Sequence, residues 1–489
     1  MTAAAEPAGG PQIRITTVSK GTDMAEKRDI VIIGGGPGGY LAAMRAAQLK
    51  KTVTLVDRDR IGGTCINYGC IPTKYLLHQT KVLKELAGAK NLEGPAGDVK
   101  LNWGKVQQGR QAVVDQLVKG LVFLLEKGRV EIVTAPARLR ADRSVVVRTA
   151  DGERVYEADT VVVATGSVAA GLPFLKADGK TVITSTEALT LSEVPKSLLV
   201  VGAGAIGLEM GSIYRRLGTD VTVLEILPQI LPGSDKEAVT RLERALKKQG
   251  LKIFTEMKIE AAVVEDGSVS LKGLSLKTNA PFEIKAEKVL LSAGRKPETA
   301  DLFDGEPFLA MDRGFIRVDA ALRTNVPGIY AIGDVIGGKL LAHKAYHDAI
   351  VAVENACGMS RTVDYAALPA AVFTEPEFAS VGLTQEEAAA RGLEVKSGVF
   401  PLQASGRAMT MDATDGLVKV LADESGKVVG AHVVAPGASD MLPVLTMAVA
   451  RGLTLDELDG IIYIHPTLSE MIGEAALKAE NRALHILNT

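Results

Sequence analysis

Three observations predict an α/β fold with several domains. Apolar strand patterns alternate with helical patterns from about residue 29 to residue 345. Within that stretch, one order of elements (strand, glycine turn, helix, strand, acidic residue) occurs twice. From about residue 370 the pattern changes to a two-strand hairpin at Val418 to Val434 with helical patterns on both sides, which predicts a separate C-terminal α+β unit.

The composition describes a large protein of balanced charge. Its 489 residues are 47% apolar, with 56 basic and 58 acidic side chains and a net charge of −2. This length supports about three domains with cores of their own, and no charge excess favours a nucleic acid or a membrane as partner. Three cysteines are too few for the disulfide framework of a secreted protein, so we expect a cytoplasmic location.

Residues 1–27 are expected to be a flexible tail. This stretch is rich in Ala, Gly, Pro and Thr, and it lacks the basic start and apolar core of a secretory signal. Glu6 and Asp23 argue against an organelle-targeting peptide. Beyond the tail, no uncharged apolar run reaches the roughly 18 residues that a membrane helix needs.

The first copy of the repeated pattern is DIVIIGGGPGGYLAAMRAAQLKKTVTLVD. It predicts a buried strand over Ile30 to Ile33, then a helix, then a second strand over Thr52 to Val56 that ends at Asp57. The dinucleotide-binding fingerprint of Rossmann-like folds is matched by Gly34, Gly36 and Gly39. In that fingerprint the first glycine makes a tight turn, the second admits a pyrophosphate and the third seats the helix on the sheet.

The second copy, SLLVVGAGAIGLEMGSIYRRLGTDVTVLE, places Gly202, Gly204 and Gly207 before the helix and Glu225 after the second strand. In both copies 23 positions separate the first glycine from the acid, the spacing of a ribose-binding carboxylate. Two such units predict two dinucleotides, a flavin and a nicotinamide that exchange electrons. Glu225 would repel a 2′-phosphate, and ILPQILPGS after it lacks an arginine, so the second site should prefer NAD over NADP.

Three further strands run into turns of small residues, at 158–167, 287–299 and 325–337. Such turns let the backbone pass close to a ligand. The third turn presents Asp334, whose carboxylate suits either a sugar hydroxyl or the cap of a following helix.

The stretch GGTCINYGCIPTK contains Cys65 and Cys70. Zinc is disfavoured, because only His78 lies nearby as a further ligand, and we expect no metal site. Five residues of regular helix separate two Cα atoms by more than a disulfide allows, so a bonded pair requires a loosened segment, which the neighbouring glycines permit. A helix is predicted from Ile71, and its N-terminus would lower a thiolate pKa and favour redox chemistry.

A redox pair also needs a group that moves protons. His465 precedes a proline, and Glu470 follows five residues later at the predicted start of a helix. Glu470 can hold one imidazole nitrogen and leave the other as an acid–base group, although a lone histidine is often structural.

These motifs, together with AIGDV, LAHKA at 341–345 and HPTLSE at 465–470, resemble the FAD-dependent pyridine nucleotide-disulfide oxidoreductases over about residues 28 to 480. The resemblance implies that the first fingerprint with Asp57 holds FAD, that Asp334 contacts its ribityl or phosphate region, and that the second fingerprint holds NAD. It implies a redox disulfide in which Cys65 exchanges with substrate and Cys70 faces the flavin. Lys74 would pair with Glu209 near the flavin, and His465 with Glu470 would serve the other subunit of a homodimer. Further cofactor contacts are assigned to Thr64, Thr165, Gly166, Gly294 and Ala342.

The same resemblance implies an order of domains and a substrate. The domains would be 28–177 for FAD and the redox disulfide, 178–305 for NAD, 306–369 as a central domain that completes the FAD site, and 370–489 for dimerisation. The substrates would be dihydrolipoyl groups on separate carrier proteins of 2-oxoacid dehydrogenase or glycine cleavage complexes, oxidised as NAD⁺ is reduced.

Several residues depart from the pattern of the family. Asp57 replaces a more usual glutamate, Tyr68 stands where a small aliphatic residue is common, Glu375 replaces a frequent histidine, and 345–350 lacks the usual acidic pair and glycine. Two other functions therefore stay open: an NADH-dependent reductase of another disulfide or a quinone, and a non-catalytic partner-binding subunit. The second predicts a missing thiol or base, whereas Cys65, Cys70, Lys74 and His465 are all present. A mercuric reductase would need a C-terminal thiol pair, which the chain lacks.

Overall fold

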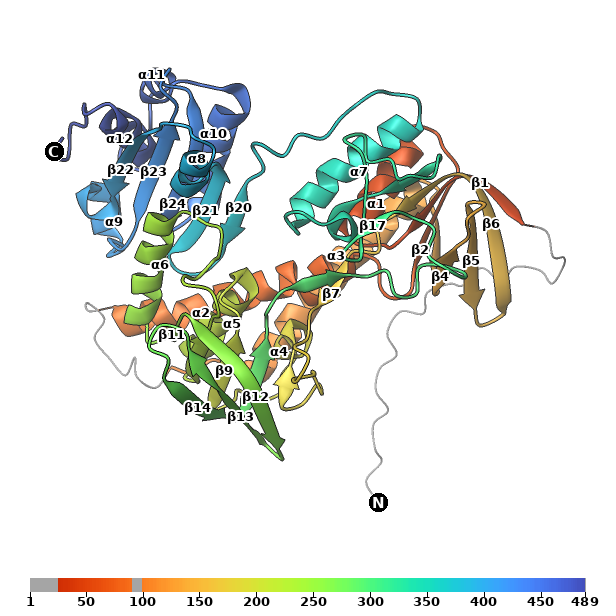
Figure 1. Ribbon diagram of the computed structural model, residues 1–489, viewed down its shortest axis with the longest axis horizontal. Coiled ribbons are helices and arrows are strands. Elements are labelled where there is room, and N and C mark those ends of the chain that lie inside the picture. The colour runs from red at the N-terminus through yellow and green to blue at the C-terminus, as the bar shows by residue number, and fades with distance from the viewer. Residues whose placement is uncertain (1–24, 90–98, 489) are drawn as a thin grey trace.

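The computed structural model describes residues 25–89 and 99–488. The N-terminal tail that the sequence predicts lies outside the described residues as far as position 24. Figure 1 shows three groups of elements: at the right, a sheet with helices from residues 37–48 and 342–356; at the lower centre, a second unit; and at the upper left, the C-terminal unit. Within the described ranges, every helix is too short or too polar to cross a lipid bilayer.

The first unit is built on a seven-stranded sheet in the order β3-β2-β1-β6-β5-β4, with β19 also paired to β6. Its strands are β1 (Glu26–Ile33), β2 (Val53–Asp57), β3 (Glu131–Thr134), β4 (Ala137–Leu139), β5 (Ser144–Thr149), β6 (Gly152–Val163) and β19 (Ile329–Ala331). Strands β1, β2, β3, β6 and β19 pair in parallel, whereas β4 and β5 are antiparallel. The chain order therefore reverses at β1, which is where open α/β sheets bind ligands.

Helix α1 (Pro37–Gln48) connects β1 to β2 and packs against α7 (Ala342–Ala356). Because β19 joins the first sheet and α7 packs on α1, a segment 300 residues downstream completes the first unit. The apolar face of the sheet and these two helices share one core, which includes Ile32, Leu55, Ala42 and Ala352.

The second unit has five parallel strands in the order β11-β10-β9-β15-β8. They are β8 (Val182–Ile183), β9 (Ser197–Val201), β10 (Asp220–Leu224), β11 (Lys252–Phe254) and β15 (Lys288–Leu291). Helices α4 (Ser185–Ala188), α5 (Ala205–Arg216) and α6 (Lys236–Lys248) belong to this unit, and β12 (Met257–Glu265), β13 (Ser268–Ser275) and β14 (Pro281–Ala286) form a three-stranded antiparallel sheet beside it. Again β9 is the strand at which the order reverses.

Two chain crossings join the first and second units side by side. Where the chain leaves the first unit after β6, it forms strand β7 (Ser167–Ala169), and where it returns after β15, it forms strand β16 (Arg295–Pro297). These two strands pair in antiparallel fashion. Helix α2 (Cys70–Gly88) packs against both α3 (Trp103–Lys127) and α5, and it buries Leu76 and Leu77 in the core of the second unit. The helix that follows the cysteine loop therefore lies between the two units.

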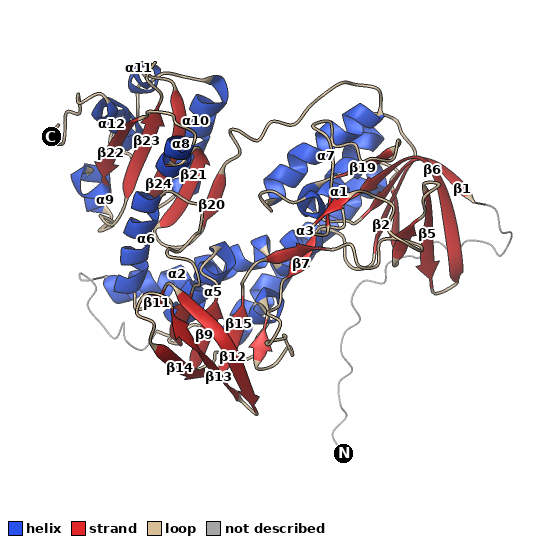
Figure 2. Ribbon diagram, in the orientation of Figure 1, coloured by secondary structure: helices blue, strands red, loops and turns tan. Residues whose placement is uncertain are grey.

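The C-terminal unit is a five-stranded antiparallel sheet in the order β20-β21-β24-β23-β22. Its strands are β20 (Ala370–Val372), β21 (Glu377–Gly382), β22 (Lys396–Pro401), β23 (Leu417–Ala422) and β24 (Val428–Ala435), and its helices are α8 (Gln385–Ala390), α9 (Gly406–Thr410), α10 (Ala438–Arg451), α11 (Leu455–Asp459) and α12 (Glu470–Ala479). Figure 2 shows these helices around a sheet of their own, apart from the sheets of the first and second units.

The predicted fold class is confirmed: two Rossmann-like units and a C-terminal α+β unit, with the predicted hairpin formed by β23 and β24. One prediction was wrong at its boundary. Strand β1 begins at Glu26, so Glu26 and Lys27 pair with β6 and do not belong to a tail. The polar start of the strand is stabilised by ion pairs of Arg28 with Glu131 (2.9 Å) and of Arg154 with Glu26 (2.8 Å).

Candidate functional site

The two glycine turns have nearly the same geometry. The first glycine of each has a positive φ, +107° at Gly34 and +103° at Gly202, which only glycine adopts without strain. The third glycine packs on the first, because a Cβ on Gly39 or Gly207 would collide with the carbonyl oxygen of Gly34 or Gly202. The three roles that the fingerprint assigns to its glycines are thus visible in the backbone.

The acids that end β2 and follow β10 reach back to these turns. Asp57 Oδ2 accepts a hydrogen bond from Gly35 N–H (2.5 Å), and Glu225 Oε2 accepts one from Ala203 N–H (2.8 Å). The other oxygens accept from the amides of Asp59 (2.8 Å) and Leu227 (2.9 Å). Burial raises the pKa of Asp57 against these amide hydrogen bonds. Both carboxylates are therefore fixed at the edge of their glycine turn, where a ribose hydroxyl would meet them.

Space for a ligand surrounds several predicted contact positions. A Cβ on Gly204, Gly166 or Gly294 would meet no heavy atom within 4 Å. Among the described residues, the hydroxyl oxygen of Thr165 is buried without a hydrogen-bond partner, which is costly unless a ligand supplies one. Together with the free amides at the start of α1 and α5, these positions fit two dinucleotides.

Asp334 lies where the two chain crossings meet the first sheet. It follows Gly333 in the turn η3 (Gly333–Ile336) and does not cap it, since Ile332 is the residue before the turn and makes no side-chain cap. Its Oδ2 accepts from the Ser167 hydroxyl (2.5 Å), whose oxygen accepts in turn from Arg295 Nε (2.7 Å). The sequence allows two roles for the Asp334 carboxylate, contact with a sugar hydroxyl or capping of a following helix. The structure excludes capping.

The cysteine loop, residues 62–69, closes on the first glycine turn. Gly62 N–H donates to the carbonyl of Gly35 (2.8 Å), and a Cβ on Gly63 would come 2.5 Å from the Cα of Gly36. Thr64–Tyr68 form a π-helix, the loosened segment that a bonded pair requires, and α2 begins at Cys70, one residue earlier than predicted. Both cysteines are free thiols and partly buried, so the structure describes the dithiol form.

The two thiols are electrostatically unequal. A hydrogen bond from Cys65 lowers the pKa of Cys70 to about 7 against the cost of burial, and the charge of Lys74 helps. The same hydrogen bond, burial and the neighbouring thiolate raise the pKa of Cys65. Cys70 is thus the thiol that loses its proton more readily, and Cys65 the one that keeps it.

Lys74, one turn into α2, forms an ion pair with Glu209 of α5 (Nζ to Oε2, 2.8 Å). Glu209 is 4% exposed, and its Oε1 accepts from Phe373 N–H (2.9 Å) in the turn between β20 and β21. The ring of Phe373 lies 4.4 Å from Lys74 Nζ, a cation–π contact. One buried carboxylate therefore joins all three units beside the thiols.

His465 and Glu470 form the predicted hydrogen bond, Nδ1 to Oε1 at 2.7 Å. Although partial burial opposes it, hydrogen bonds from Thr467 N–H and from His465 lower the pKa of Glu470. The His465 side chain is 82% exposed, and in the described part of the chain it bonds to neither cysteine. The chain by itself does not bring this pair to the thiols.

Comparisons with known proteins agree with this geometry. The family profile described as pyridine nucleotide-disulphide oxidoreductase matches residues 28–356, and the profile of its dimerisation domain matches residues 368–476. The chain belongs to the pyridine nucleotide-disulphide oxidoreductase family. This membership confirms the predicted class of enzyme, an oxidoreductase, and the predicted cofactors FAD and NAD.

Named relatives cover nearly the whole chain. The chain is 42% identical to the dihydrolipoyl dehydrogenase of Thermus scotoductus (94% of this chain, 99% of that one) and 39% identical to that of Bacillus subtilis (94% and 100%). Among solved structures it is similar to LpdA of Mycobacterium tuberculosis (TM-score 0.82, 29% identity) and to the HOCl-induced flavoprotein disulfide reductase RclA of Escherichia coli (TM-score 0.80, 27% identity), each covering 92% of this chain and 99% of the other.

Several residues at the site of this disulphide oxidoreductase escaped the sequence reasoning. Ser167 and Arg295 hold Asp334, and Phe373 joins Lys74 and Glu209. Ser167 and Arg295 each follow a glycine predicted to face a ligand, a signal that was available, whereas nothing near Phe373 indicates its contact. Thr64 is exposed at the start of the π-helix, and Ala342 is the first residue of α7. The described residues contain no group of His, Cys, Asp or Glu side chains placed to hold a metal ion.

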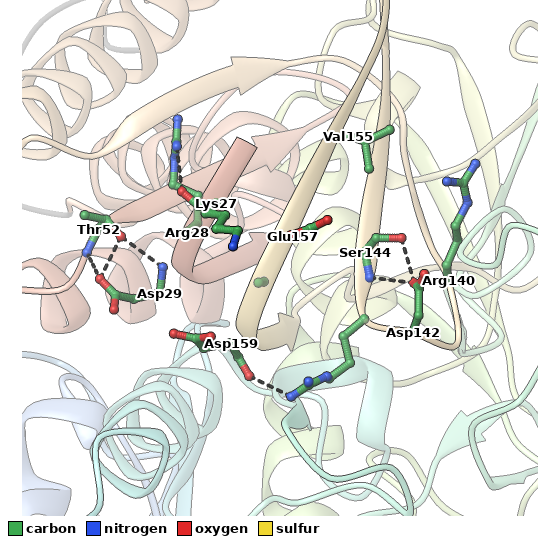
Figure 3. Close-up of a pocket in the computed structure, with 12 residues that line it drawn as sticks. Lys27, Arg28, Asp29, Thr52, Arg140, Asp142, Ser144, Val155, Glu157 and Asp159 are labelled. Atoms are coloured by element: carbon green, nitrogen blue, oxygen red, sulfur yellow. Dashed lines mark hydrogen bonds between the residues drawn. The ribbon is translucent and has the colours of Figure 1, made fainter. Parts of the chain in front are cut away.

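A polar pocket of about 620 Å³ lies elsewhere, lined by residues at the amino ends of β1 and β5 and in the middle of β6 (Figure 3). Its side chains bond to one another: Thr52 to Asp29, Ser144 to Asp142, and Arg143 to the carbonyl of Asp159. Open α/β sheets bind ligands at the carboxyl ends of their strands, so this pocket, which lies at the amino end of β1, is not part of the dinucleotide sites.

Proposed function

We propose that the chain is a dihydrolipoyl dehydrogenase, which oxidises dihydrolipoyl groups on separate carrier proteins and reduces NAD⁺. The observation that carries the proposal is the polarised thiol pair at the start of α2, between two dinucleotide-binding units. Relatives of about 40% identity over nearly the full length bear this name.

The residues of the first unit would hold FAD and those of the second NAD. Asp57 and the turn at Gly34, Gly36 and Gly39 would bind the adenosine diphosphate part of FAD, with Thr165, Gly166, Asp334 and Ala342 along the rest. The turn at 202–207 with Glu225 and Gly294 would bind NAD, and the buried carboxylate of Glu225 disfavours a 2′-phosphate. FAD, when bound, supplies two-electron transfer between a dithiol and a nicotinamide.

The thiols would act in two exchange steps. In the oxidised enzyme, one thiolate of the substrate attacks the sulfur of Cys65, the Cys65–Cys70 bond breaks, and Cys70 leaves as the thiolate that its surroundings stabilise. The second substrate thiolate then attacks the substrate sulfur of the mixed disulfide, closes the lipoyl ring and releases Cys65. The substrate is thereby oxidised by two electrons, and the enzyme holds the dithiol.

The two substrate thiols give up two protons: we assign one to His465 Nε2 of the partner subunit in a homodimer, and the Cys65 sulfur released in the second step takes up the other. Glu470 holds Nδ1 at 2.7 Å, which leaves Nε2 free, and the imidazole is exposed at the surface of the unit that matches the dimerisation domain. Exposed Ile462 (97%) and Ile464 (78%) beside it provide an apolar surface for that contact.

The domain division predicted from the sequence, with boundaries at 178, 306 and 370, is retained in this proposal, as are lipoyl carriers as partners and a cytoplasmic location. The pairing of β19 and the packing of α7 support the assignment of the third segment to completion of the FAD site.

An anaerobic titration tests the proposal. Dihydrolipoamide added to the purified protein should produce a long-wavelength thiolate-to-flavin band, and NAD⁺ added next should yield NADH. Cys65→Ser should reduce this turnover at least about a thousandfold, because the exchange sulfur is lost, while the matched variant Cys357→Ser keeps it. A flavin that NADH reduces but dihydrolipoamide does not would refute the substrate assignment and favour another disulfide.

A further inference from the structure

A buried ion pair lies behind the candidate cofactor site. Lys344 and Asp348, one turn apart on α7, join Nζ to Oδ2 at 2.9 Å, and their side chains are 3% and 0% exposed. Withdrawing two charges from water is costly, so a buried pair is weak evidence for stability alone. The function of this pair therefore follows from the groups that it binds.

Both backbone polar atoms of Gly333 are bound by this pair. Gly333 N–H donates to Asp348 Oδ2 (3.0 Å), and Lys344 Nζ donates to the carbonyl oxygen of Gly333 (3.3 Å). Gly333 has φ +74°, and a Cβ there would come 3.1 Å from the Cβ of Ala345. The residue immediately before Asp334 is therefore held on both sides by one helix.

A third side chain completes the network from a different part of the chain. Tyr365 O–H donates to Asp348 Oδ1 (2.6 Å), and Lys344 Nζ lies 5.1 Å from the centre of its ring. Tyr365 lies in the connection between the two matched family regions, 28–356 and 368–476. Just past this connection, at the start of the second matched region, the carbonyl of Pro369 lies 2.7 Å from His343 Nε2 of α7.

We infer that Lys344, Asp348 and Tyr365 are positioning residues: by clamping Gly333 they aim the Asp334 carboxylate at the FAD site and fix the start of α7 relative to it. This inference rests on the proposed function, in which Asp334 and Ala342 contact FAD. Because Tyr365 belongs to the connection, the placement of the C-terminal unit and the retention of FAD are coupled through one carboxylate.

The test measures FAD release from purified holoenzyme, as the rise of free flavin fluorescence after dilution, with no substrate present. Tyr365→Phe removes one hydrogen bond to a buried carboxylate and should speed FAD release roughly tenfold. Asp348→Asn should speed FAD release more, because a neutral amide then replaces the carboxylate that accepts from Gly333 N–H and pairs with Lys344. The control is Tyr214→Phe, which removes the hydrogen bond of a fully buried tyrosine hydroxyl to the carbonyl of Ala188 in the second unit, a site more buried than that of Tyr365, and should leave FAD release unchanged.

Asp348→Asn leaves Lys344 buried without its counter-ion, and this variant is at risk of misfolding. The double variant Lys344→Met with Asp348→Leu removes both charges and keeps side chains of similar shape, and it should also release FAD faster. Wild-type release rates in Tyr365→Phe and in the double variant would overturn the inference, as would equal acceleration in Tyr214→Phe. A purified protein without any flavin would instead count against the proposed function.

Discussion

The two glycine turns repeat one backbone, yet their surroundings differ. The first turn is covered by the cysteine loop, whose Gly63 lies against Gly36. Among the residues that the structure describes, none covers the second turn in this way, and a Cβ on Gly204 would meet none of their heavy atoms within 4 Å. In the proposed function, the same fingerprint would therefore serve one nucleotide enclosed by a loop and another that faces open space. We expect the first nucleotide to stay bound through catalysis and the second to exchange.

Substitutions at the third glycines should have the largest effect on the difference between the two turns. Gly39→Ala and Gly207→Ala each place a methyl group against a backbone carbonyl in their own turn, with no flexible side chain to yield at that contact. We expect Gly39→Ala to yield protein without flavin, and Gly207→Ala to keep flavin and lose NAD⁺ reduction. The visible absorbance of the purified variants measures their flavin content. Flavin loss in both variants would mean that the two turns are not independent.

Gly63→Ala tests the cover itself. Gly63 has φ +54°, and its added methyl group would meet the Cα of Gly36 at 2.5 Å, which should cost about 1–3 kcal/mol of strain. The variant should release FAD faster and leave NAD⁺ binding unchanged. Denaturant unfolding and flavin fluorescence measure the two effects, with Gly267→Ala in the distant β12–β13 turn, also at positive φ and with open space around it, as control.

Gly204→Ala tests whether NAD⁺ occupies the open space at the second turn. The methyl group meets no protein atom and Gly204 has φ −76°, so folding should tolerate it, but it occupies space meant for the pyrophosphate. The KM for NAD⁺ should rise about tenfold, equivalent to about 1.4 kcal/mol, with flavin content unchanged. Steady-state kinetics at saturating dihydrolipoamide provide the measurement, and an unchanged KM would place the nucleotide elsewhere.

The smallest predicted effect concerns the pKa of Cys70, which directly follows the cysteine loop. Because the pKa of Cys70 is lowered to about 7, its thiolate is present above that pH and is lost as pH falls through about 7. Lys74→Met removes a cation that favours the thiolate, so the loss should begin at a higher pH. The long-wavelength absorbance of the reduced enzyme, titrated from pH 9 to 5, reports both; coincident curves for wild type and variant would exclude Lys74 from this role.

The sequence predicts the parts of the fold that depend on local pattern. Glycine spacing, acid spacing and strand alternation depend on nearby residues, so both turns, Asp57, Glu225 and the hairpin were found. Contacts such as Gly63 on Gly36 or Phe373 on Glu209 join distant segments, and no local pattern encodes them. The early start of β1 was missed because ion pairs from β3 and β6 stabilise polar residues that an apolar pattern does not count.

The exposed imidazole of His465 has a genetic consequence. If each site takes its cysteines from one chain and its histidine from the other, a site fails when either chain contributes a defective part. Chains carrying Cys65→Ser and chains carrying His465→Ala would each be inactive alone. Co-expressed, they would form mixed pairs in which one of the two sites is intact, so two null alleles would complement each other within a single gene.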